Sequence, residues 1–187
     1  MKHIATMALM LNLGVAGLYA QHNPVNMEFS GTAGPSTINL QQPNTTNDEA
    51  NYTGNGTLGP FTFRNVRAIA ASPQSSSICS GPSKLYFPSV AGAGVFRFQD
   101  GSLLKVALMQ GGDCIDLVAM EGHCTMTFKI TGGTGRFNGA SGVLTLTETA
   151  IQVMDAANNP VLFTEAGEIT GTISGVALAE EAQGGRR

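Results

Sequence analysis

Short runs in which apolar and polar residues alternate recur along the chain, and glycine-containing segments separate them. The clearest runs are 25–29, 95–98 with 103–109, 124–130 and 143–149, and the last expected strand is 167–178. A period of two places successive side chains on opposite faces of a strand that is buried on one face. Beyond residue 20 we find no helical period of useful length. The chain is therefore predicted to be all-β, as a sandwich or a barrel.

Turn-forming residues predict where several of these strands end. An Asp-Gly pair at 100–101 between apolar runs indicates a hairpin with a type I′ turn. Residues 55–56 or 58–60 are the expected bend between two further strands. Residues 40–49 are polar and contain a proline, which predicts a loop. The pattern does not decide the secondary structure of residues 67–86, because a short apolar run there is followed by a serine-rich segment.

A glycine-rich corner, residues 131–142, joins the strands 124–130 and 143–149. A phosphate-binding loop would need a helix after its glycines, whereas an alternating threonine-rich run follows here. The glycines therefore shape a reversal between two strands. We expect Gly135 or Gly142 to adopt a backbone conformation that is closed to other residues. The structural residues of the corner are Gly132, Gly133, Gly135, Phe137 and Gly142.

The corner sequence Gly132-Gly133-Thr134-Gly135-x-Phe137-x-x-Ala140-x-Gly142 resembles the signature of the allene oxide cyclase and dirigent-like barrels. The resemblance covers the C-terminal third well, and before Ala91 it is a similarity of strand spacing. It implies an antiparallel eight-stranded β-barrel with a partly apolar lumen, rather than a β-sandwich. The whole chain resembles secreted bacterial proteins that carry this corner. The acid–base residues of the family lie outside the corner, so no catalytic residue is carried over.

The N-terminus has the pattern of an exported protein. Residues 1–20 follow the charged, apolar and small-residue order of a signal peptide, which predicts a secreted or periplasmic product without a membrane span. Residues 21–178 are then a single barrel domain, and 179–187 are a flexible polar tail. The net charge is −3 and the basic residues are scattered, so nucleic acid is not an expected partner. The oligomeric state is left open, and no cofactor is expected.

Three cysteines in an oxidising compartment predict one disulfide. Cys114 and Cys124 flank the polar connection 113–123, and a disulfide between them would close its base. Cys79 lies in a serine-rich loop and competes for either partner. The connection also groups possible metal ligands, but their spacing matches no zinc or calcium site. A solvated loop closed by the disulfide is the expected structure, and copper binding at His22 would require processing immediately before it.

Charged residues on apolar strand faces are the candidates for chemistry. Glu148 shares a face with Leu144 and Leu146, and Lys105 shares one with Leu103 and other apolar residues. If these faces line a barrel, each ion needs a partner or a shifted pKa. Such a lumen suits binding of the polar end of a lipid-like ligand, or acid–base catalysis. The alternatives are that the faces point outward or that the two ions pair.

Arg136 has two interpretations, an anion-binding residue at the mouth of the barrel or a solvated residue of its rim. Three functions stay open at this point. The first is a non-catalytic binding or structural protein whose lumen holds a small apolar molecule. Its ligand-binding residues would be Glu148, Lys105, Arg136, Leu144 and Leu146. The second is an isomerase or cyclase of the allene oxide cyclase type, with Glu148 and Lys105 as candidate catalytic residues. The third is an extracellular carbohydrate or cell-surface module, which the absence of Trp disfavours.

Overall fold

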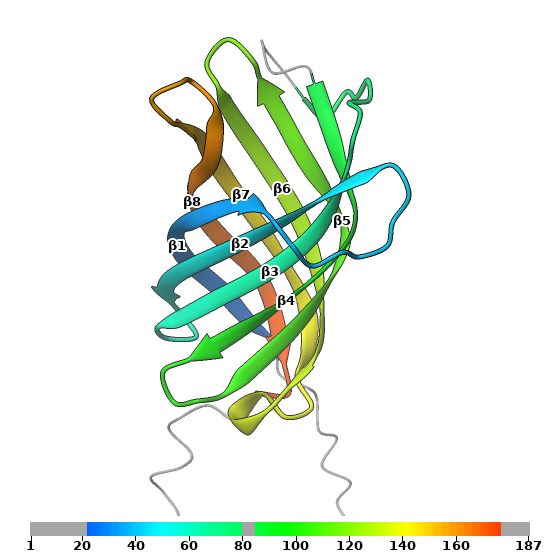
Figure 1. The fold of residues 1–187 in the computed structure, drawn as a ribbon. Helices are drawn as coiled ribbons and strands as arrows, with labels where there is room; N and C mark the ends of the chain where they lie inside the picture. Colours follow the sequence, from blue (N-terminus) through cyan, green and yellow to red (C-terminus); the bar gives the residue numbers. More distant parts are fainter. Residues whose placement is uncertain (1–21, 80–84, 177–187) are drawn as a thin grey trace, which may run out of the picture.

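The computed structural model describes residues 22–79 and 85–176, which form a closed antiparallel β-barrel of eight strands (Figure 1). The strands are β1 (Asn23–Pro35), β2 (Thr45–Gly56), β3 (Phe61–Ala70), β4 (Leu85–Phe98), β5 (Leu103–Asp116), β6 (Glu121–Gly133), β7 (Ser141–Met154) and β8 (Pro160–Ser174). Each strand pairs with its neighbours in sequence, and β1 pairs with β8, so the barrel has no free edge. The barrel prediction is confirmed over the sandwich.

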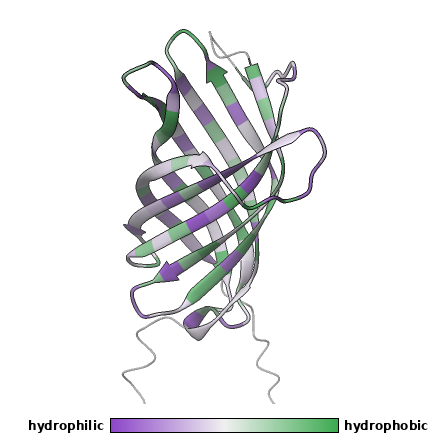
Figure 2. Ribbon diagram, in the orientation of Figure 1, coloured by the Kyte–Doolittle hydropathy of each residue, from purple (hydrophilic) through white to green (hydrophobic). Residues whose placement is uncertain are grey.

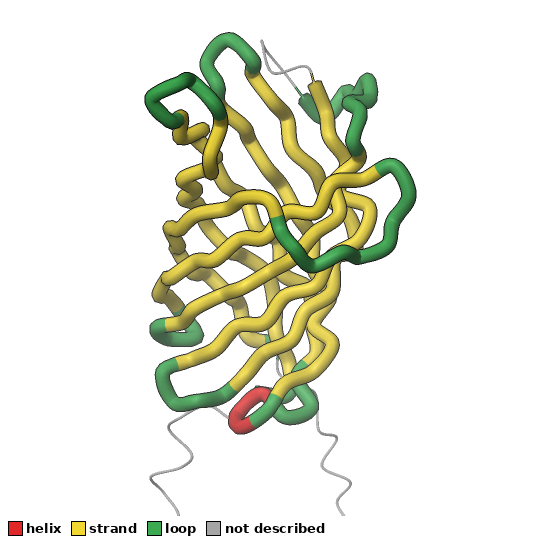
Figure 3. Tube along the Cα trace, viewed as in Figure 1, coloured by secondary structure: helices red, strands yellow, loops and turns green. Residues whose placement is uncertain are grey.

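The predicted signal peptide, 1–20, and the predicted tail, 179–187, lie outside the described residues. Across the described part of the chain, no helix is long and apolar enough to cross a membrane. The one helical element there is η1 (Gly135–Phe137), a single 3-10 turn in the connection from β6 to β7 (Figure 3).

The alternating pattern determines which side chains enter the barrel. In β1, Val25, Met27 and Phe29 are buried and the residues between them are exposed, and Figure 2 shows the same alternation of hydropathy along several strands. Aromatic side chains fill the interior towards the end that carries η1. The rings of Phe63 and Phe96 stack with their centroids 3.9 Å apart. This half of the barrel is therefore a packed core, stabilised by burial of apolar surface.

The corner closes this end of the barrel. Phe137 is fully buried, and its ring lies 4.7 Å from that of Phe98. The predicted backbone conformations are confirmed, since φ is 60° at Gly135 and 145° at Gly142. A side chain at Gly142 would also place its Cβ only 2.1 Å from the carbonyl oxygen of Thr172. Only glycine fits there, because both its φ and the close approach of β8 exclude a Cβ.

Two predictions of local structure need correction. The hairpin around 100–101 is present, but it is not a type I′ turn. Gly101 N–H donates to the Phe98 carbonyl at 2.9 Å and φ is positive at Gly101 but not at Asp100, whereas a type I′ turn needs positive φ at both central residues. The loop expected at 40–49 is half strand, since β2 begins at Thr45 and its polar residues pair with β3. The bend that follows β2 lies at 57–60, with φ of 83° at Gly59.

A β-bulge in β5 changes which side chains face inward. Leu104 and Val106 are buried before the register shift between Leu108 and Gln110, and Asp113 is buried after it. The extra residue moves the inward positions from even to odd numbers. Asp113 therefore enters the barrel, while its neighbour Cys114 is displaced to the other face of the sheet.

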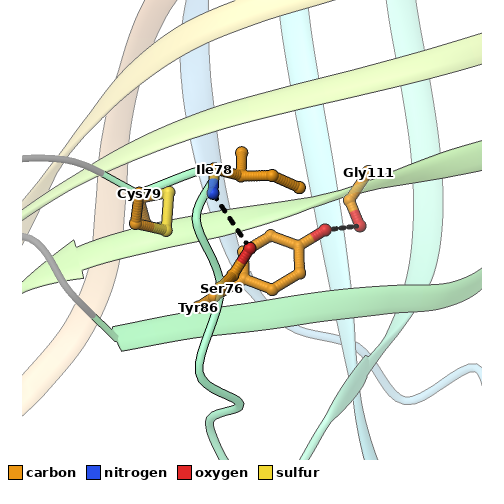
Figure 4. Close-up of a disulfide and its surroundings, with 6 residues drawn as sticks. Ser76, Ile78, Cys79, Tyr86 and Gly111 are labelled. Atoms are coloured by element: carbon orange, nitrogen blue, oxygen red, sulfur yellow. Dashed lines mark hydrogen bonds between the residues drawn. A yellow bond between two sulfur atoms is a disulfide. The ribbon is translucent and has the colours of Figure 1, made fainter.

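The bulge explains why the predicted disulfide between Cys114 and Cys124 is wrong. Cys79, shown in Figure 4, is bonded to Cys114, with the Cα atoms 5.4 Å apart. Cys124 is free and buried inside the barrel. The register pairs Cys114 with His123, which is exposed, so Cys124 lies one position further on and points to the opposite face. The expected solvated loop at 113–123 is also wrong, because β5 and β6 occupy all of it except 117–120.

Candidate functional site

A cavity of about 570 Å³ enters the barrel at the end opposite η1. It is bounded by the ends of the strands that the β5–β6 and β7–β8 connections join, which form the upper end in Figure 1. Most of its walls are apolar. The apolar lining residues are Pro35, Ile69, Phe87, Ile115, Leu117, Met120, Ala150 and Phe163. The volume lies within the range of small-molecule sites.

A layer of polar side chains crosses the barrel between this cavity and the aromatic core. We call it the polar layer. Its members are Asp48, Tyr52, Arg67, Asp113, Glu148 and Glu165. Tyr52 joins the layer to the core, because its ring stacks on that of Phe29 at 4.5 Å. Asp48, Arg67, Asp113 and Glu165 also line the cavity. A ligand in the cavity would therefore meet carboxyl groups at its inner end.

Arg67 is the only basic side chain that is buried in the described part of the chain. Its Nη1 lies 2.8 Å from Asp113 Oδ1, and its Nη2 and Nε each lie 3.3 Å from Asp48 Oδ2. Nη1 also lies 3.1 Å from the thiol sulfur of Cys124. Burial by itself would lower the pKa of Arg67, but the anionic groups around it, Asp113 foremost, raise that pKa well above its ordinary value.

Tyr52 links two glutamates across the barrel. Its hydroxyl oxygen lies 2.8 Å from Glu148 Oε2 and 2.5 Å from Glu165 Oε2. A tyrosine hydroxyl has one proton to donate, so both hydrogen bonds form only if one carboxyl group is protonated and donates to the tyrosine oxygen. The arrangement is thus a chain of carboxylic acid, phenol and carboxylate.

The pKa values agree with a shared proton. Burial raises the pKa of Glu165 to about 8, and the neighbouring charge of Glu148 adds to the effect. Burial also raises the pKa of Glu148, although Arg67 and the hydrogen bond from Tyr52 oppose the change. Burial therefore favours one protonated carboxyl group in this chain, and we expect Glu165 to hold the proton at neutral pH and to donate it to Tyr52, which then donates to Glu148.

Alternation along the strands explains why most side chains of the polar layer point into the barrel. Phe61 and Phe63 point inward from β3, so Arg67, four residues after Phe63, points inward as well. Glu165 enters from β8 in the same way, four residues before buried Ile169. Tyr52, Arg67 and Glu165 were not among the site residues predicted from the sequence. The alternation of each strand does place these residues at inward positions. A charged residue at such a position, however, resembles a residue at which the strand has left the core.

Among the predicted site residues, Glu148 lies inside the barrel with 3% exposure. Leu144 and Leu146 share its face and are buried, but they belong to the packed core and do not line the cavity. The prediction that Lys105 faces the interior is wrong, because this side chain is exposed on the outer surface and pairs with no glutamate of the interior. Leu104 and Val106 occupy the inward face of β5 instead. Both faces of that strand are apolar, and the lysine stays in water because burial of its charge would cost more.

The predicted anion-binding position of Arg136 at the mouth is also wrong, because Arg136 lies at the η1 end of the barrel and not at the mouth of the cavity. Its Nε is 3.1 Å from Asp100 Oδ2, and its Nη2 donates to the carbonyl oxygen of Leu58. The guanidinium lies over the rings of Phe98 and Phe137, 4.8 and 4.6 Å from their centroids. These contacts tie three connections together, which is a structural role.

In the described part of the chain, no group of three or more His, Cys, Asp or Glu side chains is arranged to hold a metal ion. No protein-family model matches this chain, and no curated protein matches it. The allene oxide cyclase and dirigent resemblance therefore stays a prediction, whereas the closed eight-stranded barrel rests on the strand pairing.

Proposed function

We propose that this barrel is a binding protein for a small molecule with an apolar body, held in the cavity with its polar end at the polar layer. The observation that carries the proposal is the cavity itself, about 570 Å³ with mostly apolar walls and the buried carboxyl group of Glu165 at its inner end. Sites for small molecules usually combine such walls with a few polar groups that fix the orientation of the ligand. The closed sheet supplies a rigid frame for both.

The test is binding of a fluorescent apolar probe, N-phenylnaphthylamine, by the purified protein. Ala150 lines the cavity beside Gly122, so Ala150→Phe should fill part of the space and abolish binding of the probe. The matched control is Ala166→Phe, because Ala166 is exposed on the outer face of β8. Binding by the wild type and Ala166→Phe but not by Ala150→Phe supports the proposal. Equal binding by all three proteins, or none by the wild type, would contradict it.

Acid–base catalysis on a bound molecule is the second candidate, and the chain from Glu165 through Tyr52 to Glu148 favours it. A carboxyl group with a pKa of about 8 can both donate and accept a proton near neutral pH. This is also the activity class that the resemblance to allene oxide cyclases implies. Infrared titration should reveal a protonated carboxyl group at pH 7 that is lost in Glu165→Gln. If that band is missing from the wild type at pH 7, this candidate loses its support.

The third function, a carbohydrate module, receives no support from the outer surface. Every aromatic side chain that the structure describes is buried or half-buried, so these residues offer no exposed aromatic platform. The disulfide between Cys79 and Cys114 is compatible with an oxidising compartment. It supports the proposal that the protein works outside the cytoplasm, in the periplasm or secreted.

A further inference from the structure

The charges around the cavity are strongly unbalanced. Five carboxyl groups and one guanidinium line it. The acidic residues are Asp48, Asp113, Asp116, Glu121 and Glu165, and the basic residue is Arg67. Asp116 accepts hydrogen bonds from the backbone N–H groups of the β5–β6 turn, and Glu121 lies at the rim. The innermost carboxyl groups, Asp48, Asp113 and Glu165, therefore decide which polar head a ligand can carry.

Arg67 does not offer a site for an anion. Its nitrogen atoms are already directed to Asp113, Asp48 and the sulfur of Cys124. An anionic head at the inner end of the cavity would lose these contacts or face the carboxyl groups without a donor of its own. Either arrangement leaves a buried charge unpaired, which is costly.

We propose that the ligand of the cavity carries an organic ammonium head, which lies against Glu165 and Asp48. This inference rests on the proposed binding function and specifies its ligand. Glu165 is 4% exposed, and Tyr52 is its one side-chain hydrogen-bond partner within the described residues. Its carboxyl group thus keeps acceptor capacity for a cation. Two aromatic rings, Phe87 and Phe163, line the walls, and aromatic faces attract ammonium groups.

Binding of a cation at Glu165 should release a proton. Without a cation this carboxyl group holds its proton up to about pH 8, and an adjacent ammonium favours the ionised form. The groups that act on Glu165 are Glu148 of β7, Tyr52 and Asp48 of β2 and Arg67 of β3. Asp113 of β5 and Cys124 of β6 are further ionisable groups buried in the barrel. Strand β1 carries only Glu28 in its described range, and that side chain is exposed.

The experiment compares three ligands with one eight-carbon chain: octyltrimethylammonium, octanol and octanoate. Each displaces N-phenylnaphthylamine from the protein at pH 7. The ammonium ligand should bind about tenfold or more tightly than octanol, and octanoate should bind most weakly. Its affinity should rise by up to about tenfold per pH unit between pH 6 and 8 and then level off, because the ligand itself does not titrate. Octanol should show no such dependence.

Glu165→Gln should weaken the ammonium ligand by about tenfold or more and leave octanol within about twofold. Glu168→Gln is the matched control, because Glu168 is on the same strand and is exposed. If Glu165→Gln does not fold, Asp48→Asn replaces it, with the same selective loss expected. Equal or tighter binding of octanol or octanoate overturns the ammonium inference and leaves the binding function standing. Failure of the probe and of all three ligands to bind overturns both.

Discussion

Replacement of Arg67 by methionine tests the polar layer most directly. Methionine keeps most of the buried volume, so the change removes the charge and its hydrogen bonds to Asp113 and Asp48. The side chains of Arg67, Asp113 and Asp48 are 7%, 12% and 14% exposed, so little solvent is available to replace the guanidinium. Loss of one partner from a buried ion pair typically costs about 3–5 kcal/mol.

The cost should also depend on pH, because the variant can relieve an unpaired charge by binding a proton. Protonation of an aspartate with its ordinary pKa of 3.8 costs about 1.4 kcal/mol per pH unit above that value. The cost for one carboxyl group is therefore about 4 kcal/mol at pH 7 and about 2 kcal/mol at pH 5. Destabilisation by Arg67→Met should accordingly shrink by about half between these pH values.

The assay is equilibrium urea unfolding at pH 7 and pH 5 with the disulfide intact. With an m-value of about 2 kcal/mol per M, the midpoint should fall by roughly 2 M at pH 7 and roughly 1 M at pH 5. Arg64→Met is the matched control, because Arg64 also pairs with an acid of β2, Glu49, at 2.7 Å, but on the exposed face of the same strand. Its effect should be far smaller. Equal effects of the two substitutions, or a cost for Arg67→Met that does not change with pH, would refute the reasoning.

Three further predictions follow from single features of the barrel. The native Glu165 holds a proton that the unfolded chain releases above pH 4.5, so this group lowers stability as pH rises from about 4.5 to about 8. The unfolding free energy of Glu165→Gln, measured in urea, should therefore rise relative to wild type from pH 5 to pH 8. Gly142→Val should cost more than about 1 kcal/mol in thermal or urea unfolding, because φ is 145° and its Cβ would meet a backbone oxygen of β8. Non-reducing peptide mapping should recover Cys79 linked to Cys114, and Cys124 should react with thiol reagents only after unfolding.

Two of these have a control variant, and each of the three has a result that would contradict it. Glu168→Gln should give a stability curve parallel to that of wild type, and a parallel curve for Glu165→Gln would contradict the raised pKa. Gly34→Ala should be nearly neutral, because a Cβ there meets nothing closer than 3.8 Å. If Gly142→Val is equally neutral, the account of the corner is wrong. A linked peptide that contains Cys124 would contradict the placement of that residue inside the barrel.

Local patterns were enough to predict several of the strands and the corner. Alternation predicted β1, β6 and β7 because the side-chain period of a strand is a property of consecutive residues. The conformation of Gly142 was predictable for the same reason, since a reversal within a few residues needs positive φ somewhere. The choice of barrel over sandwich came from the resemblance of the corner and not from the alternation itself, which both architectures share.

Only the tertiary structure decided the faces of Asp113 and Lys105 and the partner of each cysteine. The bulge in β5 depends on how that strand pairs with β6, and it turns Asp113 inward and Cys114 outward. Both faces of β5 are apolar around Lys105, so alternation could not choose between them. Closure of the sheet then brings Tyr52 to Glu165, 113 positions away in the chain. Pairing register and closure are set by strands distant in sequence, so the pattern along any one strand does not contain them.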